Sequence, residues 1–144
     1  MMILSDILKK KGNRVIHVVP GTSINETVNL MVSNKIGAVL VVTDDHNPVG
    51  IFTERDNLRV SANPDIDPMK TAVDDYMSKE LVCGLPDDLV EEAMATMTEQ
   101  RVRHLPVVAD KKLVGLVSIG DIVKETASKY KSEIKYLKNY IQGY

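Results

Sequence analysis

The sequence predicts a mixed α/β (α+β) fold in which a β-α-β-β-α unit occurs twice, with pseudo-two-fold symmetry, and is followed by a long helix. Three observations lead to this prediction. Similar segments recur about 66 residues apart, strand-like and helix-like hydrophobic patterns alternate within each copy, and no proline follows residue 106. We expect the first unit over residues 1–68 and the second over residues 69–144.

The repeat is carried by three pairs of matching segments. These begin at Pro20 and Pro86, continue with residues 37–42 and 103–108, and end with residues 49–56 and 114–121. Because the three pairs keep the same order and nearly the same spacing, the second half of the chain is expected to repeat the fold of the first half.

Each copy opens with a short β-rich run, which is Val15–Val19 in the first copy and Leu81–Cys83 in the second. An amphipathic helix follows each run. Its apolar face is expected to carry Ile24, Val28 and Met31 in the first copy, and Val90, Met94 and Met97 in the second. These faces predict one packed helix after each opening strand.

Two strands and a second helix complete each copy. The continuous apolar run Ala38–Val42 predicts a strand that is buried on both faces. Polar residues at Asp44–Asn47 and Asp110–Lys112 predict the turns between the paired strands.

The connection between the two copies is expected over Ala62–Lys70, where two prolines interrupt the apolar period. Short helices are expected at Ser5–Leu8 and Asp74–Met77. Each of them is predicted to lead into the copy that follows it in the sequence.

Composition places the chain among compact proteins of the reducing cytoplasm. Hydrophobic residues make up 44% of the 144 residues, and a net charge of -2 argues against a nucleic-acid-binding surface. Cys83 is the only cysteine, and its apolar neighbours predict a buried, inert thiol. No apolar run approaches the ~18 residues of a membrane span, and the first residues lack a signal-peptide pattern. The basic run Lys9–Lys11 is expected to complement the dipole of a helix C-terminus.

No catalytic or metal-binding arrangement is visible in the sequence. His17 and His46 fall in a strand and in a turn, and no histidines have the spacing of a metal site. No nucleophile motif lies beside a base. We therefore expect a protein that is not an enzyme and that holds no metal of its own.

Thr53–Asp56 and Ser118–Asp121 occupy the junction between a strand and a helix in the two copies. A helix N-terminus offers unpaired N–H groups to a phosphate, the hydroxyl can donate to the same phosphate, and the aspartate can accept from both ribose hydroxyls. A hydroxyl residue followed three positions later by an acid is also a capping box, which stabilises a helix without any ligand. The two roles are compatible.

These segments together resemble the CBS domain, the repeat named for cystathionine β-synthase. The resemblance rests on the β-α-β-β-α order, on the pattern Gly-apolar-apolar-Thr/Ser-x-x-Asp in both copies and on the segment Arg103–Pro106, and it covers roughly residues 1–130. A tandem pair of such domains is a Bateman module. The chain is most similar to free-standing CBS pairs of bacteria and archaea. It is thereby implied to bind AMP, ADP, ATP, NAD(H) or S-adenosylmethionine, with Mg²⁺ as an optional companion of the phosphates.

The resemblance implies two clefts, and each of them takes residues from both repeats. One cleft groups Ser118 and Asp121 with Val19, Thr22, Gly37 and Ala38, and the other groups Thr53 and Asp56 with Cys83, Arg103 and His104. The first grouping matches the family better, because Thr22 follows Pro20 at a position where a polar contact to the base is common. Asp87 and Asp88 lie near the opening of the second cleft and repel phosphate there.

The candidate phosphate-binding side chains are Arg55, Arg101, Arg103 and His104. An arginine suits phosphate because its guanidinium donates as a planar fork. Strand alternation is expected to place Arg101 and Arg103 on one side and His104 on the other, and Pro106 indicates an edge or irregular position in that strand. The alternative is a solvated basic strand edge that binds nothing. Gly120 replaces Arg55 in the second motif, so the two sites should differ.

A long helix is expected from Ile119 to Gln142, about 36 Å at 1.5 Å per residue. Tyr130, Ile134, Leu137 and Ile141 recur at the 4-3-4 spacing of a helix–helix seam. We expect this seam to pack against a second copy of the chain and form a homodimer. The alternative is a helix that folds back on its own repeat.

Two functions remain open at the level of the sequence. The first is a non-catalytic sensor that binds an adenosine nucleotide and acts on an unidentified target protein. The alternative is a structural dimerisation or partner-docking protein without a nucleotide ligand. Neither function involves a membrane or nucleic acid.

Overall fold

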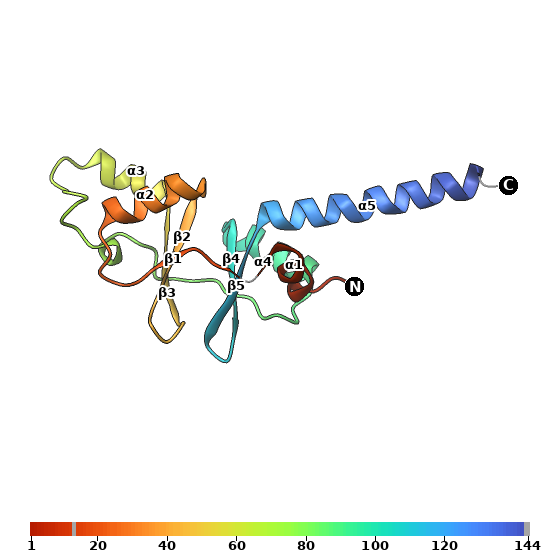
Figure 1. Ribbon diagram of the computed structural model, residues 1–144, viewed down its shortest axis with the longest axis horizontal. Coiled ribbons are helices and arrows are strands. Elements are labelled where there is room, and N and C mark those ends of the chain that lie inside the picture. Colours follow the sequence, from red (N-terminus) through yellow and green to blue (C-terminus); the bar gives the residue numbers. More distant parts are fainter. Residues whose placement is uncertain (13, 143–144) are drawn as a thin grey trace.

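The computed structural model describes residues 1–12 and 14–142 and contains the two expected units side by side, with one long helix leaving the second unit (Figure 1). The helices are α1 (Leu4–Lys11), α2 (Ile24–Asn34), α3 (Glu54–Ala62), the 3-10 turn η1 (Val73–Asp75), α4 (Val90–Gln100) and α5 (Ile119–Gln142). The strands are β1 (His17–Val18), β2 (Ala38–Val42), β3 (Pro48–Thr53), β4 (His104–Ala109) and β5 (Lys112–Ser118). Residues 143–144, which close the expected second unit, lie outside the described residues.

The first unit contains a three-stranded sheet in the order β1-β2-β3. Strand β1 runs parallel to β2, and β2 pairs with β3 in the antiparallel direction. Every residue of β2 is buried, as its continuous apolar sequence predicts. Strand β1 covers two residues, fewer than the five of Val15–Val19, since Val15 and Ile16 pair with no strand.

The second unit keeps only the antiparallel pair β4-β5. The expected opening strand Leu81–Cys83 is absent, and the chain makes one parallel bridge instead, between Gly84 and Val107. A Cβ on Gly84 would stand 2.7 Å from Leu4 Cδ1 of α1 and 2.9 Å from Leu105 Cδ2 of β4, so only glycine fits between the helix and the sheet at this point. The prediction of a full strand over Leu81–Cys83 was wrong, because only Gly84 pairs with β4 and the proline at position 86 stops the pairing from continuing beyond it.

The two units exchange their short leading helices. Leu4, Ile7 and Leu8 of α1 are buried in the core formed by α4, β4, β5 and the start of α5. Conversely, Val73 of η1 is buried in the core of the first unit, and Met77 packs against it. The expectation that Ser5–Leu8 leads into the first copy and Asp74–Met77 into the second therefore holds for the sequence order but not for the packing. The helix of the second segment is also shorter, Val73–Asp75.

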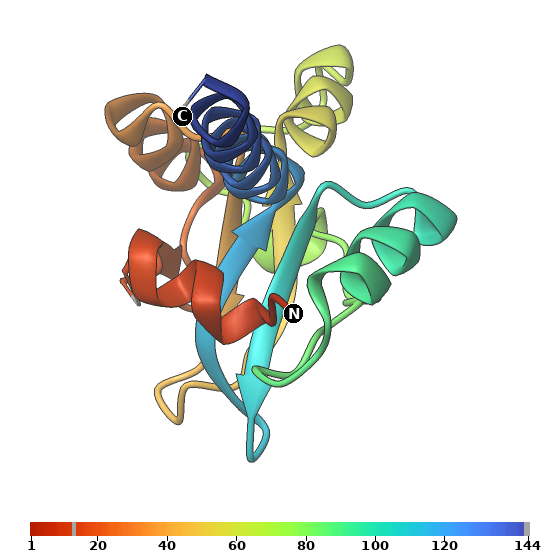
Figure 2. The same ribbon diagram turned by 90° about the vertical axis from the view of Figure 1, so that its right-hand side faces the viewer.

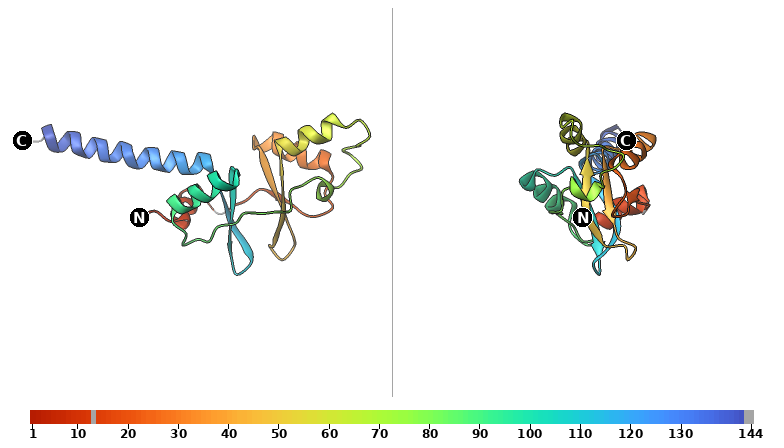
Figure 3. Two further views of the ribbon diagram at one scale, coloured as in Figure 1. Left: turned by 180° about the vertical axis from the view of Figure 1, so that it is seen from behind. Right: turned by 90° about the vertical axis from the view of Figure 1, so that its left-hand side faces the viewer.

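Because of this exchange, the chain crosses between the units twice, once from α1 to β1 and once from η1 to α4, and we call these two segments the crossovers. The backbone N–H of Leu4 donates to Asp88 O at 3.0 Å, and the equivalent N–H of Val73 donates to Thr22 O at 2.7 Å. The two hairpins lie side by side (Figure 3), and Leu113 N donates to His46 O at 2.7 Å across the gap between the units. The units are thus tied together at the sheet ends as well as by the crossovers.

The last helix begins inside the second unit and then leaves it. Ile122 is buried in the second core, whereas every residue from Ala127 to Ile141 is exposed. Figure 1 shows this helix extending away from the body, and Figure 2, which looks along the long axis of the molecule, shows it nearly end-on. The seam residues Tyr130, Ile134 and Leu137 remain 58%, 52% and 55% exposed, so the alternative in which the helix folds back on its own repeat is wrong.

Candidate functional site

The two strand-to-helix junctions have the same local geometry. Thr53 caps α3, and Asp56 N donates to Thr53 Oγ1 at 3.3 Å while Thr53 N donates to Asp56 Oδ2 at 2.9 Å. In the second unit, Asp121 N donates to Ser118 Oγ at 3.0 Å and Ser118 N donates to Asp121 Oδ2 at 2.9 Å. The capping-box interpretation is therefore confirmed at both junctions. It leaves other lone pairs of the hydroxyl and carboxylate oxygens free for further partners.

The Asp56 carboxylate is enclosed by its own unit. Its side chain is 9% exposed, and Oδ2 accepts from the Thr53 hydroxyl at 3.1 Å as well as from the Thr53 N–H. The nearest cation is Arg59 of the same helix, with Nη1 3.9 Å from Asp56 Oδ1. Little of this carboxylate is open to a ligand.

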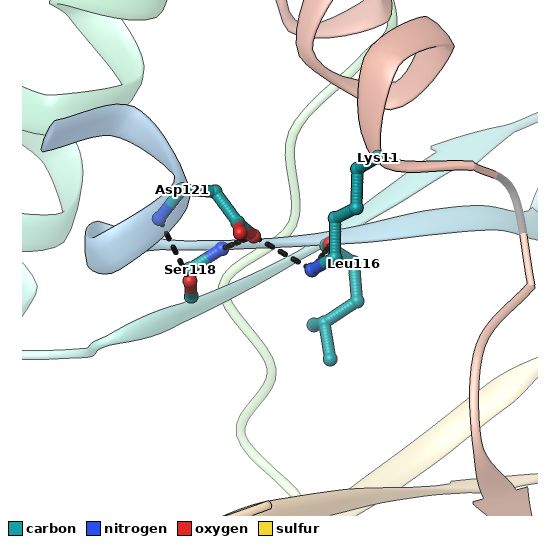
Figure 4. Close-up of polar contacts among 4 residues, drawn as sticks. All are labelled: Lys11, Leu116, Ser118 and Asp121. Atoms are coloured by element: carbon teal, nitrogen blue, oxygen red, sulfur yellow. Dashed lines mark hydrogen bonds and ion pairs between the residues drawn. The ribbon is translucent and has the colours of Figure 1, made fainter. Parts of the chain in front are cut away.

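The Asp121 carboxylate is more open and has a cation from a distant segment. Lys11 Nζ at the end of α1 donates to Asp121 Oδ2 at 2.6 Å and to Leu116 O at 2.7 Å (Figure 4). The Asp121 side chain is 25% exposed. Burial raises the pKa of Asp121, but the hydrogen bonds from Lys11 and Ser118 outweigh it, so the pKa lies below its ordinary value.

His104 lies close to charged groups of both units. Burial lowers its pKa, the charges of Lys11 and Arg103 lower it further, and Asp121 and Glu54 oppose them with a smaller effect. Glu54 begins α3 of the first unit, so the charge that acts on the pKa of His104 includes a contribution from the other unit. The imidazole is neutral at pH 7 and can both donate and accept a hydrogen bond.

The residues opposite the two junctions occupy equivalent places. Gly37 O accepts from Glu54 N at 3.1 Å, and Arg103 O accepts from Ile119 N at 3.0 Å. In the sheets Ala38 is paired with Thr53, and His104 with Ser118. These contacts join each junction to its own unit, and the grouping of Ser118 and Asp121 with Gly37 and Ala38 stays a prediction.

Thr22 closes the turn that carries Pro20. Its hydroxyl donates to Val19 O at 2.7 Å, and its backbone N–H donates to the same oxygen at 3.2 Å. Asp74 of η1 holds the turn from outside, because its Oδ1 accepts from Gly21 N at 2.7 Å. Val19 is 45% exposed beside this turn. The Thr22 hydroxyl can still accept a hydrogen bond from a ligand.

The basic candidates are not arranged as strand alternation predicted. Arg101 is the C-cap of α4 with φ 57°, a left-handed residue, so it lies outside the strand that begins at His104. The backbone at the end of α4 sets the direction of the Arg101 side chain. The prediction that Arg101 and Arg103 lie on one side of a strand was therefore wrong. Arg55, Arg101 and Arg103 are all exposed. Pro106 lies in β4 on the side of the single bridge, where Gly84 N donates to Pro106 O at 2.8 Å, in agreement with the predicted edge position.

Cys83 is exposed, and the prediction of a buried thiol was wrong. The apolar residues beside it do not form a strand, so nothing covers the sulfur from both sides. Desolvation still raises the pKa of the Cys83 thiol above its ordinary value, which keeps it protonated at neutral pH.

Lys11 is a residue of the candidate site that the sequence did not predict. The expected role of Lys9–Lys11 at a helix C-terminus is present, since all three lie in the last turn of α1. The contact with Asp121 depends on α1 packing against the second unit, and no local sequence pattern reports such packing.

Two grooves lie away from the junction acids, one between the two larger helices of each unit. The groove between α2 and α3 has a volume of about 610 Å³ and includes Met31, Gly37 and Leu58 in its wall. The groove between α4 and α5 has a volume of about 390 Å³ and includes Met94, Ile122 and Tyr130. Neither wall includes Asp56 or Asp121, and Gly37 is the one expected nucleotide-binding residue that lies in either wall, so the junctions and not these grooves are the candidate site.

Among residues 1–12 and 14–142, no group of three or more His, Cys, Asp or Glu side chains is placed to hold a metal ion.

Within the described part of the chain, no helix is long and apolar enough to cross a membrane.

Comparison with known proteins gives a consistent result. The model of the CBS domain matches twice, at residues 4–62 and 73–128. The mitochondrial CBS domain-containing protein CBSX3 of Arabidopsis thaliana is 34% identical over 97% of this chain and 72% of its own length. A relative from Thermofilum pendens is 36% identical, but the chain spans only 35% of its length.

Solved structures share the fold. A CBS-domain-containing protein of Agrobacterium tumefaciens is 36% identical, with a TM-score of 0.78 over 86% of this chain and 98% of that one. CBSX2 in complex with AMP has a TM-score of 0.79 at 24% identity, over 90% of this chain and 99% of that one. The CBS domain pair of protein MJ0100, in complex with 5′-methylthioadenosine and S-adenosyl-L-methionine, has a TM-score of 0.78 at 23% identity, over 90% of this chain and 98% of that one.

Proposed function

Since this chain belongs to the CBS-domain family, with two CBS repeats in tandem, we propose that it is a non-catalytic sensor that binds an adenosine nucleotide between the repeats. The observation that carries the proposal is the Ser118–Asp121 junction, where a partly exposed carboxylate and a hydroxyl lie together at the start of α5. Two structures of the same fold contain adenosine compounds, AMP in one and 5′-methylthioadenosine with S-adenosyl-L-methionine in the other.

The chemistry of the Asp121 junction suits the two halves of a nucleotide. The carboxylate has a depressed pKa, so it is ionised at neutral pH and accepts hydrogen bonds from the ribose hydroxyls. The first N–H groups of α5 and the Ser118 hydroxyl are donors for phosphate oxygens. The adenine is assigned to Val19, Thr22, Gly37 and Ala38, as the family resemblance implies.

The Asp56 junction is proposed as a second, weaker site. Its carboxylate is almost fully covered, and Arg59 already neutralises part of its charge. Arg103, His104 and Cys83 complete this grouping by resemblance. Asp87 is exposed, while the Asp88 carboxylate accepts from Leu85 N at 2.8 Å, and their two negative charges disfavour phosphate near the Pro86 turn.

The signal is proposed to pass through a homodimer. The seam Tyr130, Ile134, Leu137 and Ile141 is exposed along the part of α5 that extends beyond the body. A second copy of α5 covers such a seam by knobs-into-holes packing. A ligand changes the arrangement of repeats or subunits only if it binds one arrangement more tightly than the other. The target protein and the cytoplasmic location expected from the sequence stay predictions.

A partner-docking protein without a nucleotide ligand is the second candidate function. It is favoured by the same exposed helix, which carries Tyr136 and Tyr140 in addition to the seam, 69% and 73% exposed. This alternative predicts that no adenosine compound changes the stability of the folded protein.

Thermal unfolding separates the two functions. The panel contains AMP, ADP, ATP with and without Mg²⁺, NAD, NADH and S-adenosylmethionine. A ligand at 100 times its dissociation constant adds about 2.7 kcal/mol, so the melting temperature rises by several degrees. Absence of a shift for every compound contradicts the sensor function and favours partner docking.

Isothermal titration of the strongest ligand then tests the site. Asp121→Asn is expected to weaken binding by about tenfold or more, because it removes the charged acceptor for the ribose. Asp6→Asn is the matched control, since Asp6 Oδ2 accepts from Ile3 N at 2.9 Å at the start of α1, which is the carboxylate half of a capping box. It should leave affinity unchanged. Equal affinity in the Asp121→Asn variant contradicts the assignment of the site.

A further inference from the structure

Lys11 is held in a defined position beside the Asp121 junction. Its Nζ donates both to Asp121 Oδ2, at 2.6 Å, and to Leu116 O, at 2.7 Å. Figure 4 shows the side chain reaching from the end of α1 toward the same carboxylate that closes the Ser118 capping box. Asp121 Oδ2 therefore accepts hydrogen bonds from both the Lys11 ammonium and the Ser118 N–H.

The end of α1 is anchored independently of this contact. Leu8 packs where a Cβ on Gly115 would stand 2.5 Å from Leu8 Cδ2, so the helix lies directly on β5. Lys10 Nζ also lies 2.9 Å from Glu125 Oε2, but the Lys10 side chain is 64% exposed, so this surface pair contributes little and the apolar packing of α1 holds the helix end. Lys11 therefore stays near the junction even when its own ion pair is broken.

In the part of the chain that the structure describes, the crossover that contains η1 brings no lysine or arginine within 4 Å of the Asp56 carboxylate. Val73 and Met77 take the places of Leu4 and Leu8, because Val73 N donates to Thr22 O as Leu4 N donates to Asp88 O, and Met77 covers Gly50 as Leu8 covers Gly115. The 3-10 turn η1 ends at Asp75, so no helix continues past Met77 as α1 continues past Leu8 to Lys11.

Ser78 instead pairs with Ile51 of β3. Among the described residues, the cation within 4 Å of the Asp56 carboxylate comes from its own helix and not from the crossover. The two junctions therefore differ in the charge that the crossover brings to them.

Resting on the proposed function, we propose that Lys11 sets the ligand charge preference of the Asp121 site, and that it selects adenosine ligands with an anionic 5′ group. A ribose whose two hydroxyls engage both carboxylate oxygens of Asp121 competes with Lys11 for Oδ2. A 5′ phosphate supplies a replacement acceptor for the displaced ammonium, and the pair forms a charge-assisted hydrogen bond. A neutral 5′ group supplies none, and a sulfonium repels the ammonium.

AMP and adenosine test the proposal most directly, because they differ only in the 5′ phosphate. Their affinities are measured by isothermal titration calorimetry for the wild-type chain and for Lys11→Met, Lys11→Arg and Lys10→Met. The ratio of AMP affinity to adenosine affinity is expected to fall about tenfold in Lys11→Met, the size of one charge-assisted hydrogen bond. Lys11→Arg keeps a cation and should keep most of the ratio.

Lys10→Met is the matched control, because it removes an adjacent lysine of the same helix end without removing a contact to Asp121. It should leave the ratio unchanged. AMP bound at the Asp56 junction should have the same affinity in all four proteins, which separates the two sites in a two-site fit. Circular dichroism establishes that each variant is folded.

The outcomes distinguish this inference from the function on which it rests. A ratio in Lys11→Met within twofold of the wild-type ratio overturns the role of Lys11 and leaves nucleotide binding intact. An equal fall in Lys10→Met also overturns it, since the effect then follows general charge. If the wild-type chain binds neither AMP nor adenosine, both the inference and the sensor function are overturned.

Discussion

Gly115 of β5 lies directly beneath Leu8 of α1, so closely that a Cβ on Gly115 would stand 2.5 Å from Leu8 Cδ2 and 2.7 Å from Leu8 Cδ1. The contact joins residues at opposite ends of the chain. It places the first helix on the second unit, and with it the lysine that reaches Asp121. The absence of a side chain at Gly115 allows α1 to pack this closely on β5.

Gly115→Ala is expected to destabilise the protein by about 1–3 kcal/mol, because the added methyl group overpacks the Leu8 contact. Urea unfolding followed by circular dichroism measures the change. Gly120→Ala is the control, since the nearest atom to its added Cβ is Ser118 Oγ at 3.6 Å. Alanine is the better helix former, so this variant should gain up to about 1 kcal/mol. Equal stability of the two variants would contradict the close packing of α1.

Stability is expected to fall below pH 6.5 because of His104. The pKa of His104 in the folded protein is lower than its ordinary value, so the unfolded chain takes up the proton first. The contribution to stability is complete above the ordinary pKa of about 6.5 and is lost as the pH falls through the folded pKa. Urea midpoints at pH 7.5 and pH 5.5 should differ less in His104→Gln than in the wild-type protein. An identical pH difference in both proteins contradicts the assignment.

The homodimer is expected to depend on the exposed seam of α5. Leu137→Glu places a charge in the middle of the seam and should raise the dimer dissociation constant by about a hundredfold. Size-exclusion chromatography with light scattering measures the mass over a concentration series. Asn139→Glu adds the same residue on the opposite face of the helix and should leave the dimer intact. A monomeric wild-type chain at micromolar concentration would rule out the dimer.

Cys83 offers a test of its proposed grouping with the Asp56 junction. The thiol is exposed and has a raised pKa, so a disulfide reagent such as Ellman's reagent should modify the native protein slowly at pH 7 and faster as the pH rises. A nucleotide bound in the second grouping covers Cys83 and should slow the reaction at a fixed pH. Unchanged labelling at saturating nucleotide means that this cleft is empty. Cys83→Ser, which lacks the thiol, gives the background rate.

The sequence alone determined the repeated order of elements, because local patterns encode it. The apolar run Ala38–Val42 and the uninterrupted segment Ile119–Gln142 have the predicted bounds in the structure. The capping boxes at Thr53 and Ser118 follow from residues three positions apart. Periodicity and capping act within a few residues of each other, so a single sequence contains all the information they need.

Only the tertiary structure decided which surfaces meet. The packing of α1 on the second unit, the exposure of Cys83 and the left-handed conformation of Arg101 have no local signature. The Lys11–Asp121 pair joins residues 110 positions apart, and it exists because the two crossovers exchange their leading helices between the units. Such contacts arise from the burial of apolar surface over the whole chain. They place the Lys11 ammonium beside Asp121, a contact that the pattern of apolar residues in the sequence does not predict.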